Sequence, residues 1–93
     1  MYHVFRIRDG VYYAAERLSD AKAKAADDAG LTLEQAEQQP NAEAGRCFWF
    51  PAFVGQREMQ TLWWEDGHGN EATFADRLAS LTLTGPTIFF VAP

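Results

Sequence analysis

The sequence has few of the residues that build disulfides and metal sites. With one cysteine, Cys47, in 93 residues, it cannot form an internal disulfide, which indicates a reducing compartment. The two histidines, His3 and His68, lie far apart in the chain, and neither has a histidine or cysteine at the spacing of a metal-ligand pair. We therefore expect no bound metal and no cofactor.

Long apolar runs are also missing. No stretch is apolar over the length of a membrane span, and no basic segment followed by an apolar one opens the sequence as in a signal peptide. We therefore expect a cytoplasmic protein that makes no membrane contact. Hydrophobic residues make up 47% of the chain and charged residues 23%, which is typical of a globular protein. At this length we predict a single domain over residues 1–93.

The usual motifs of catalysis and nucleotide binding are not found. Gly67-His68-Gly69 lacks both the Lys-Ser/Thr ending of a phosphate loop and the third glycine of a dinucleotide motif. Glu65 and Asp66 are neighbours, so in an extended chain their side chains point to opposite sides and cannot flank a bond as catalytic carboxylates do. We therefore predict that the protein is not an enzyme, and a small enzyme ranks last among our hypotheses.

Basic residues are in deficit. Eight Lys and Arg stand against 13 Asp and Glu, which gives a net charge of −5. This balance argues against binding to duplex nucleic acid, because phosphate recognition needs clustered Lys and Arg. The acidic residues gather in the ranges 19–43 and 65–76. They form either a solvated surface that keeps the protein in solution or a surface that steers a basic partner towards it.

Aromatic residues, by contrast, are abundant. The chain has three Trp, three Tyr and seven Phe, many of them in the short runs 48–53, 63–64 and 89–90. Each ring can bury roughly 150–250 Å², so together they exceed what one small core needs. The surplus of aromatic side chains predicts that some of them lie on a surface that binds another molecule. An aromatic sheet that stacks single-stranded RNA is a weaker alternative, because the net charge opposes it.

The N-terminal region has the pattern of a β-hairpin. Residues 2–8 and 11–15 are strand-like, and Asp9-Gly10 between them favours a tight turn. A two-residue turn would place Ile7 opposite Tyr12 and, further along, Phe5 opposite Ala14. The rival interpretation continues residues 12–29 as one helix, and the Asp-Gly turn favours the hairpin over it.

Helical and extended patterns alternate through the rest of the chain. Ser19 is expected to cap an alanine-rich helix that lies close to a sheet and ends at Gly30. The remaining predicted elements are, in order, a short helix after Thr32, strands over 46–54 and 58–65, a helix from Thr73 that Thr84 breaks, and a strand over 87–92. We expect the last strand to be central, because it is apolar throughout.

This order of elements, ββααββαβ, predicts an α+β fold. We expect a two-layer sandwich in which a four- to five-stranded, mainly antiparallel sheet carries two to three helices largely on one face. A two-layer domain leaves the other sheet face bare, and two of the predicted strands are apolar on both sides. The uncovered face is therefore our candidate for a functional surface.

We favour a non-enzymatic protein-binding module that has no cofactor and that covers a partner's surface. Small acidic α+β chains without catalytic motifs resemble, in general character, the inhibitors that phages and mobile elements carry against host defence complexes, including anti-CRISPR proteins. Such inhibitors often fill basic, nucleic-acid-binding grooves. The alternative is a homodimer stacked through its aromatic sheet face, with a structural or small-ligand-binding role. The expected partner-binding residues are Trp49, Phe53, Trp63, Tyr13, Asp27, Asp28, Glu65 and Asp66.

Overall fold

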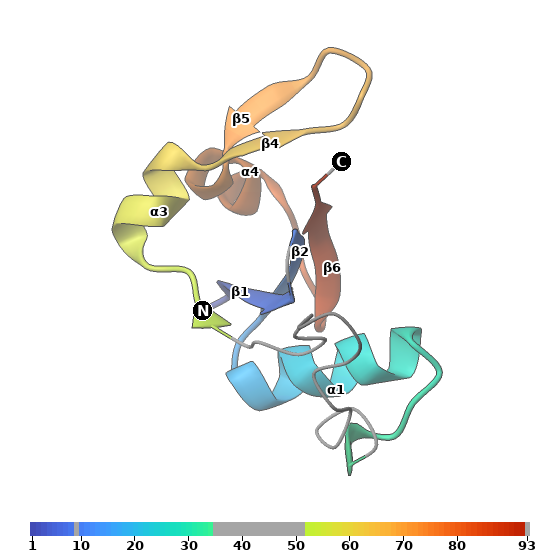
Figure 1. Ribbon diagram of the computed structural model, residues 1–93. Coiled ribbons are helices and arrows are strands. Elements are labelled where there is room, and N and C mark those ends of the chain that lie inside the picture. Colours follow the sequence, from blue (N-terminus) through green and yellow to red (C-terminus); the bar gives the residue numbers. More distant parts are fainter. Residues whose placement is uncertain (9, 35–51, 93) are drawn as a thin grey trace.

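The chain forms two antiparallel sheets and a set of short helices (Figure 1). The computed structural model describes residues 1–8, 10–34 and 52–92. The main sheet has the strand order β3-β1-β2-β6, and β4 and β5 form a separate hairpin. In chain order the elements are β1 (His3–Arg8), β2 (Val11–Ala15), α1 (Leu18–Asp28), β3 (Ala52–Phe53), α3 (Gln56–Thr61), β4 (Trp63–Glu65), β5 (Glu71–Thr73), α4 (Phe74–Ser80) and β6 (Thr87–Val91). The predicted α+β class is confirmed.

The predicted N-terminal hairpin is present, but its register differs from the expected one. Phe5 pairs with Tyr13 rather than with Ala14, because Ile7 is an extra residue in a β-bulge. Shifting a strand by one residue moves each of its side chains to the opposite face. Tyr13 therefore shares a face with Phe5 and Ile7, and the predicted pairing of Ile7 with Tyr12 is wrong.

Helix α1 covers one face of the main sheet. The small side chains of Ala21 and Ala25 pack against Phe5, Ile7 and Tyr13, and all five residues are buried. Because alanine projects so little, the helix can lie close to the strands, as its composition predicts. This layer lies at the lower end of the molecule in Figure 1.

The two ends of α1 agree only partly with the sequence prediction. The N-cap is Arg17, which makes no side-chain capping bond, so the predicted cap at Ser19 is wrong. The other end is as expected: Gly30 has a positive φ of 74°, and Leu31 N donates to the Ala26 carbonyl at 2.9 Å. Glycine adopts this left-handed conformation without the steric cost that other residues incur.

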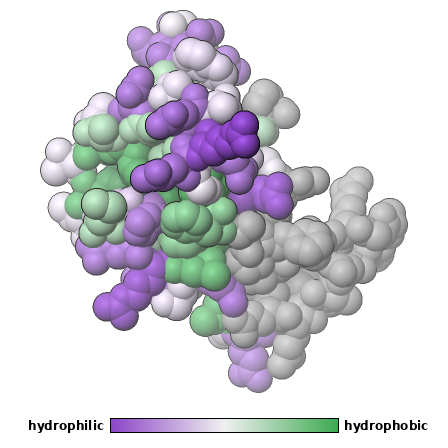
Figure 2. All heavy atoms as spheres, turned by 90° about the vertical axis from the view of Figure 1, so that its left-hand side faces the viewer, coloured by the Kyte–Doolittle hydropathy of each residue, from purple (hydrophilic) through white to green (hydrophobic). Residues whose placement is uncertain are grey.

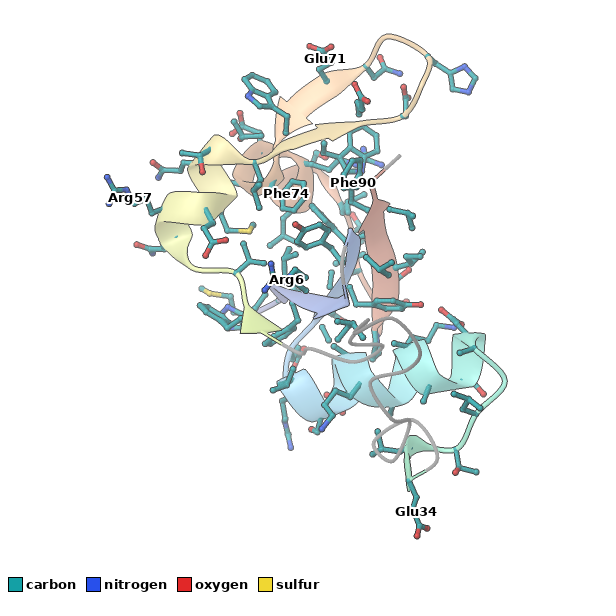
Figure 3. The ribbon with its side chains drawn as sticks, in the orientation of Figure 1. Arg6, Glu34, Arg57, Glu71, Phe74 and Phe90 are labelled. Carbon is teal, nitrogen blue, oxygen red and sulfur yellow. The ribbon has the colours of Figure 1, made fainter. Side chains whose placement is uncertain are left out.

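The opposite sheet face carries a second core centred on Phe74 of α4. The Phe74 ring is 1% exposed and lies 5.1 Å from Tyr12, 5.0 Å from Phe89 and 5.6 Å from Phe90 (Figure 3). Phe89 and Phe90 are consecutive in β6, yet both rings reach Phe74. The pairing of β6 with β2 shifts register at this point, and the irregularity lets two neighbouring side chains face the same side of the sheet. Edge-to-face ring pairs at these distances are favourable beyond their buried area.

Helices therefore lie on both faces of the main sheet, which differs in detail from the expected arrangement on largely one face. α1 packs on one side and α4 on the other. A sheet face left wholly bare is not found in the part of the chain that the structure describes. β6 is an edge strand of the described sheet and not the expected central one. Phe89 and Phe90 of this strand belong to the Phe74 core, whereas Ile88 and Val91 are exposed.

The region between β3 and β5 also differs from the sequence prediction. The pattern over residues 58–65 predicts one strand, yet the chain forms α3 first and only then β4. Residues 56–60 are good helix formers, and Thr61 Oγ1 contacts the carbonyls of Arg57 and Glu58 at 3.2 and 3.3 Å. The alternation of apolar and polar residues over 58–61 therefore does not indicate a strand.

The C-terminal helix begins where the sequence predicts. Thr73 is the N-cap of α4, and its Oγ1 accepts a hydrogen bond from Asp76 N at 3.1 Å. The helix ends at Ser80, earlier than the expected break at Thr84. The described helices are all too short to cross a membrane as apolar spans.

Two predicted elements fall largely outside the described residues. Leu33 and Glu34 are helical, in agreement with a helix after Thr32, but the rest of that helix is not described. Of the strand predicted over 46–54, the structure describes residues 52–54, of which Ala52–Phe53 form β3 and pair with β1.

Candidate functional site

An apolar cleft of about 720 Å³ opens between the start of β1, the end of β3 and the helices α3 and α4. On the face shown in Figure 2, hydrophobic residues are grouped at the centre and at the left, with hydrophilic residues between them. The apolar residues that line the cleft include Val4, Val54, Met59, Leu78, Leu81 and Leu83. Clefts of this size with mostly apolar walls are typical of binding sites.

The floor of the cleft belongs to the Phe74 core. Val4 and Val54 are buried there, and Met59 and Leu78 pack against the same core while still lining the open space. Phe74 N donates to the Leu62 carbonyl at 3.0 Å, which joins the end of α3 to the start of α4. The two helices are thereby held as adjoining walls. Apolar surface remains accessible between them, and a partner could bury it.

Phe53 lies at the rim of this cleft. Its ring is 55% exposed and lies 5.3 Å from the His3 ring and 5.7 Å from the Phe5 ring. The structure thus places this predicted partner-binding residue on an accessible surface and fixes it by contacts with two neighbouring rings. Gln56 and Gln60 of α3 add polar groups to the lining.

A second surface is the outer face of the β4–β5 hairpin. Trp63 pairs with Thr73 and Glu65 with Glu71, so these four side chains share one side of the hairpin. Trp63 is 63% exposed, and both glutamates are exposed. We call Trp63, Glu65 and Glu71 the outer hairpin surface. It brings together two of the predicted partner-binding residues and adds Glu71.

The inner face of the hairpin is anchored by the neighbouring tryptophan. Trp64 Nε1 donates to the Phe89 carbonyl at 3.1 Å, and the Arg77 guanidinium lies 4.0 Å from the centre of the indole ring. A cation over an indole face is attracted by the quadrupole of the ring. Adjacent tryptophans thus have different roles: Trp64 fixes the hairpin, and Trp63 faces solvent.

Asp66 stabilises the hairpin loop. Its Oδ1 accepts from His68 N at 2.7 Å, and its Oδ2 accepts from Asn70 Nδ2 at 2.6 Å. The Asn70 amide, followed by the His68 N–H, lowers the pKa of the Asp66 carboxyl. The carboxylate is therefore engaged inside the loop, and Gly67 and Gly69 supply the positive φ angles of the turn. Glu71, on the other strand, is more exposed than Asp66.

Asp27 and Asp28 lie on α1, at the opposite end of the molecule from the hairpin (Figure 1), and Tyr13 of β2 packs against the same helix. Tyr13 is 4% exposed, and its hydroxyl donates to Asp28 Oδ2 at 2.6 Å. Asp28 also pairs with Lys24 Nζ at 3.0 Å, and both Asp27 and Asp28 are exposed. The Tyr13 hydroxyl, and then Lys24, lower the pKa of Asp28. Tyr13 thus contributes to the core and positions a carboxylate, and its ring has almost no accessible surface.

The Tyr13–Asp28 bond makes stability depend on pH. Because the folded state lowers the pKa of Asp28 below its ordinary value of 3.8, the resulting stability is present above that pH and is lost as the pH falls through the lowered pKa.

Tyr13→Phe removes the hydroxyl that is the largest cause of the lowered pKa of Asp28. We expect the variant to unfold at lower urea concentration than wild type at neutral pH, with a difference that shrinks below pH 3.8. Urea titrations across this range measure it. A difference that is constant with pH would contradict the assignment.

Two further expectations concern metals and Trp49. Within residues 1–8, 10–34 and 52–92, no three His, Cys, Asp or Glu side chains come close enough together to hold a metal ion. Trp49, the remaining predicted partner-binding residue, lies outside those ranges, as does Cys47. Both expectations therefore remain predictions.

Sequence reasoning missed the apolar cleft and Glu71. The cleft residues come from β1, β3, α3, α4 and the segment after α4, so no short window of sequence contains them. A signal for Glu71 did exist. The loop over 66–70, rich in Gly, Asp and Asn, lies between Trp63-Trp64-Glu65 and Glu71-Ala72-Thr73, and reading it as a hairpin turn would have paired the two glutamates.

Comparison of the chain with protein-family models, with curated proteins and with solved structures finds no significant match.

Proposed function

We propose that this chain is a small, acidic, non-enzymatic protein-binding module that acts by covering part of a partner's surface. The apolar cleft is the observation that carries the proposal. Its walls leave aliphatic side chains such as Met59, Leu78 and Leu83 partly accessible, and Phe53 stands at its rim. A protruding apolar side chain of a partner would bury this surface, which is the usual basis of an interface hot spot.

The charge of the chain suggests what kind of partner it meets. With a net charge of −5, the protein is attracted to basic surfaces, and carboxylates can take the place of phosphates opposite Lys and Arg. The finer form of the proposal is an inhibitor of a host defence complex, similar in general character to anti-CRISPR proteins. A dimer stacked through sheet faces has less support, because α1 and α4 cover those faces in the described residues.

A charge placed in the cleft tests the proposal. Ala79 lies on α4, is exposed and lines the cleft, so Ala79→Glu should leave the fold intact. Burying an unpaired carboxylate against a partner costs several kcal/mol, so recovery of the complex should fall about tenfold or more. The measurement is affinity isolation of the tagged protein from cells that naturally carry the gene, followed by size-exclusion chromatography and quantification of the partner.

Ala23→Glu provides the matched control. Ala23 is exposed on α1, on the other side of the main sheet, so the same substitution there should leave complex recovery unchanged. Both variants should keep the cooperative melt of the wild type. Equal recovery with wild type and Ala79→Glu would show that the cleft is not the contact surface. Self-association without any other protein would favour the homodimer instead.

A further inference from the structure

The outer hairpin surface contains a charge pair that the fold itself does not need. Glu65 and Glu71 are directly opposite each other in the two-stranded hairpin. Side chains at such positions come within about 5 Å of each other, and like charges there destabilise the pairing. Where a local arrangement weakens the fold without an evident structural gain, a functional role is the expected explanation.

Among the residues that the structure describes, no cation offsets the pair. In the described parts of the chain, neither glutamate takes part in an ion pair or a side-chain hydrogen bond. Arg77 lies on the inner side, over Trp64, and Arg57 points outward from α3, away from the hairpin (Figure 3). Glu71 points away from the body of the molecule. The two negative charges are therefore presented together to a binding partner.

Trp63 completes the surface. It lies two residues before Glu65 on the same side of β4, about 7 Å along the strand, and diagonally opposite Glu71. Its indole is exposed, and anchoring of the hairpin is left to Trp64. An indole face attracts cations, and arginine is the cation most often found there, because its planar guanidinium can stack on the ring and bind carboxylates with its five N–H groups.

We propose that the outer hairpin surface binds an arginine side chain presented by a protein partner. The guanidinium stacks on Trp63, and its N–H groups donate to Glu65 and Glu71. This inference rests on the proposed function and assigns the hairpin as the part that meets a basic surface. Nucleic acid is the wrong occupant, since its phosphates would be repelled by both carboxylates.

The hairpin is well suited to hold these groups in place before binding. Asp66 ties its loop together, and Trp64 fixes its inner face to the Phe89 carbonyl. A surface that is already ordered loses less conformational entropy on binding. Trp63 and the two glutamates project from paired strands, whose geometry sets their separation.

The direct test uses purified protein and three capped nonapeptides. They carry three arginines, three lysines or three neutral citrullines in the same glycine–serine background. We expect the arginine peptide to shift the Trp63 indole N–H resonance saturably in ¹⁵N NMR spectra, with that resonance identified from a Trp63→Phe variant. The lysine peptide should bind several-fold more weakly and the citrulline peptide not at all. Equal binding of the arginine and lysine peptides would overturn the stacking.

Substitutions separate this surface from the overall negative charge. Glu65→Gln/Glu71→Gln should weaken binding of the arginine peptide about tenfold. It should melt no lower than wild type, because it removes a like-charge pair. The matched control, Glu16→Gln/Asp20→Asn, removes the same charge near the start of α1 and should leave binding unchanged. Equal weakening in both double variants, or saturable binding of a uridine oligonucleotide at Trp63, would overturn the proposal.

The same variants distinguish failure of this inference from failure of the proposed function. If the complex isolated from cells forms equally well with Glu65→Gln/Glu71→Gln but is lost with Ala79→Glu, the arginine site is wrong and the protein-binding function stands. If no complex with another protein forms at all, the proposed function fails. In that case a positive peptide titration shows only that the surface can bind arginine, and the assignment to a protein partner is overturned.

Discussion

Phe74→Ala should lower the free energy of unfolding by about 3–5 kcal/mol, the largest effect we expect from any single substitution in the described core. Phe74 is 1% exposed and contacts Tyr12, Phe89 and Phe90. Truncation removes all three ring contacts and leaves a cavity between α4 and the sheet. Small domains have a total stability of roughly 5–15 kcal/mol, so the variant should be partly unfolded at moderate temperature.

Urea unfolding followed by circular dichroism measures this loss. Phe53→Ala is the control, because that ring is 55% exposed and its removal should cost about 1 kcal/mol or less. Phe74→Leu fills part of the cavity and should recover part of the stability. If Phe74→Ala and Phe53→Ala were equally stable, Phe74 would not be the centre of the core. The cleft should also change in Phe74→Ala, since its floor belongs to the same core.

Ala21→Leu should destabilise the protein by about 1–3 kcal/mol although leucine is more hydrophobic than alanine. Ala21 is fully buried between α1 and the main sheet, in contact with the cluster that contains Phe5 and Ile7. The larger side chain has no space there, so either the helix must move away from the strands or the leucine must adopt an unfavourable rotamer. The close approach of α1 thus depends on a small residue at this position.

The same substitution on the exposed side of α1 is the control. Ala23→Leu should change the free energy of unfolding by about 0.5 kcal/mol or less, because its side chain is in water. Denaturant unfolding of both variants, with the slope of the transition compared, measures the difference. A stabilised Ala21→Leu would mean that the interface between α1 and the sheet contains unfilled space, contrary to the close packing around the buried Ala21.

Short sequence patterns correctly predicted a turn and two helix ends. The Asp9-Gly10 pair identified the N-terminal hairpin, Gly30 the end of α1, and Thr73 the start of α4. Each depends on one residue that adopts a particular backbone conformation or caps a helix, so neighbouring residues are enough to reveal it. Over residues 58–65 an alternation of apolar side chains predicted one strand, and this prediction is wrong for residues 58–61, which belong to α3, whereas Trp63–Glu65 form β4.

For the candidate site, the sequence identified kinds of residue but not their arrangement. Exposed aromatic rings were expected, and Phe53 and Trp63 are exposed, but Tyr13 is buried by the one-residue register shift at Ile7. Acidic residues were expected on the surface, yet Asp66 is engaged in its own loop, and Glu71 takes the place opposite Glu65. Register depends on bulges and pairings that no single strand encodes.

The sequence by itself determined the α+β class, the acidic character and the excess of aromatic side chains, because composition and short-range patterns contain that information. Only the tertiary structure decided that helices cover both faces of the sheet, that α3 and α4 enclose an apolar cleft, and that Trp63 lies beside two opposed glutamates. These features arise from contacts between residues far apart in the chain. Such contacts are set by packing and strand register, which depend on the whole fold at once.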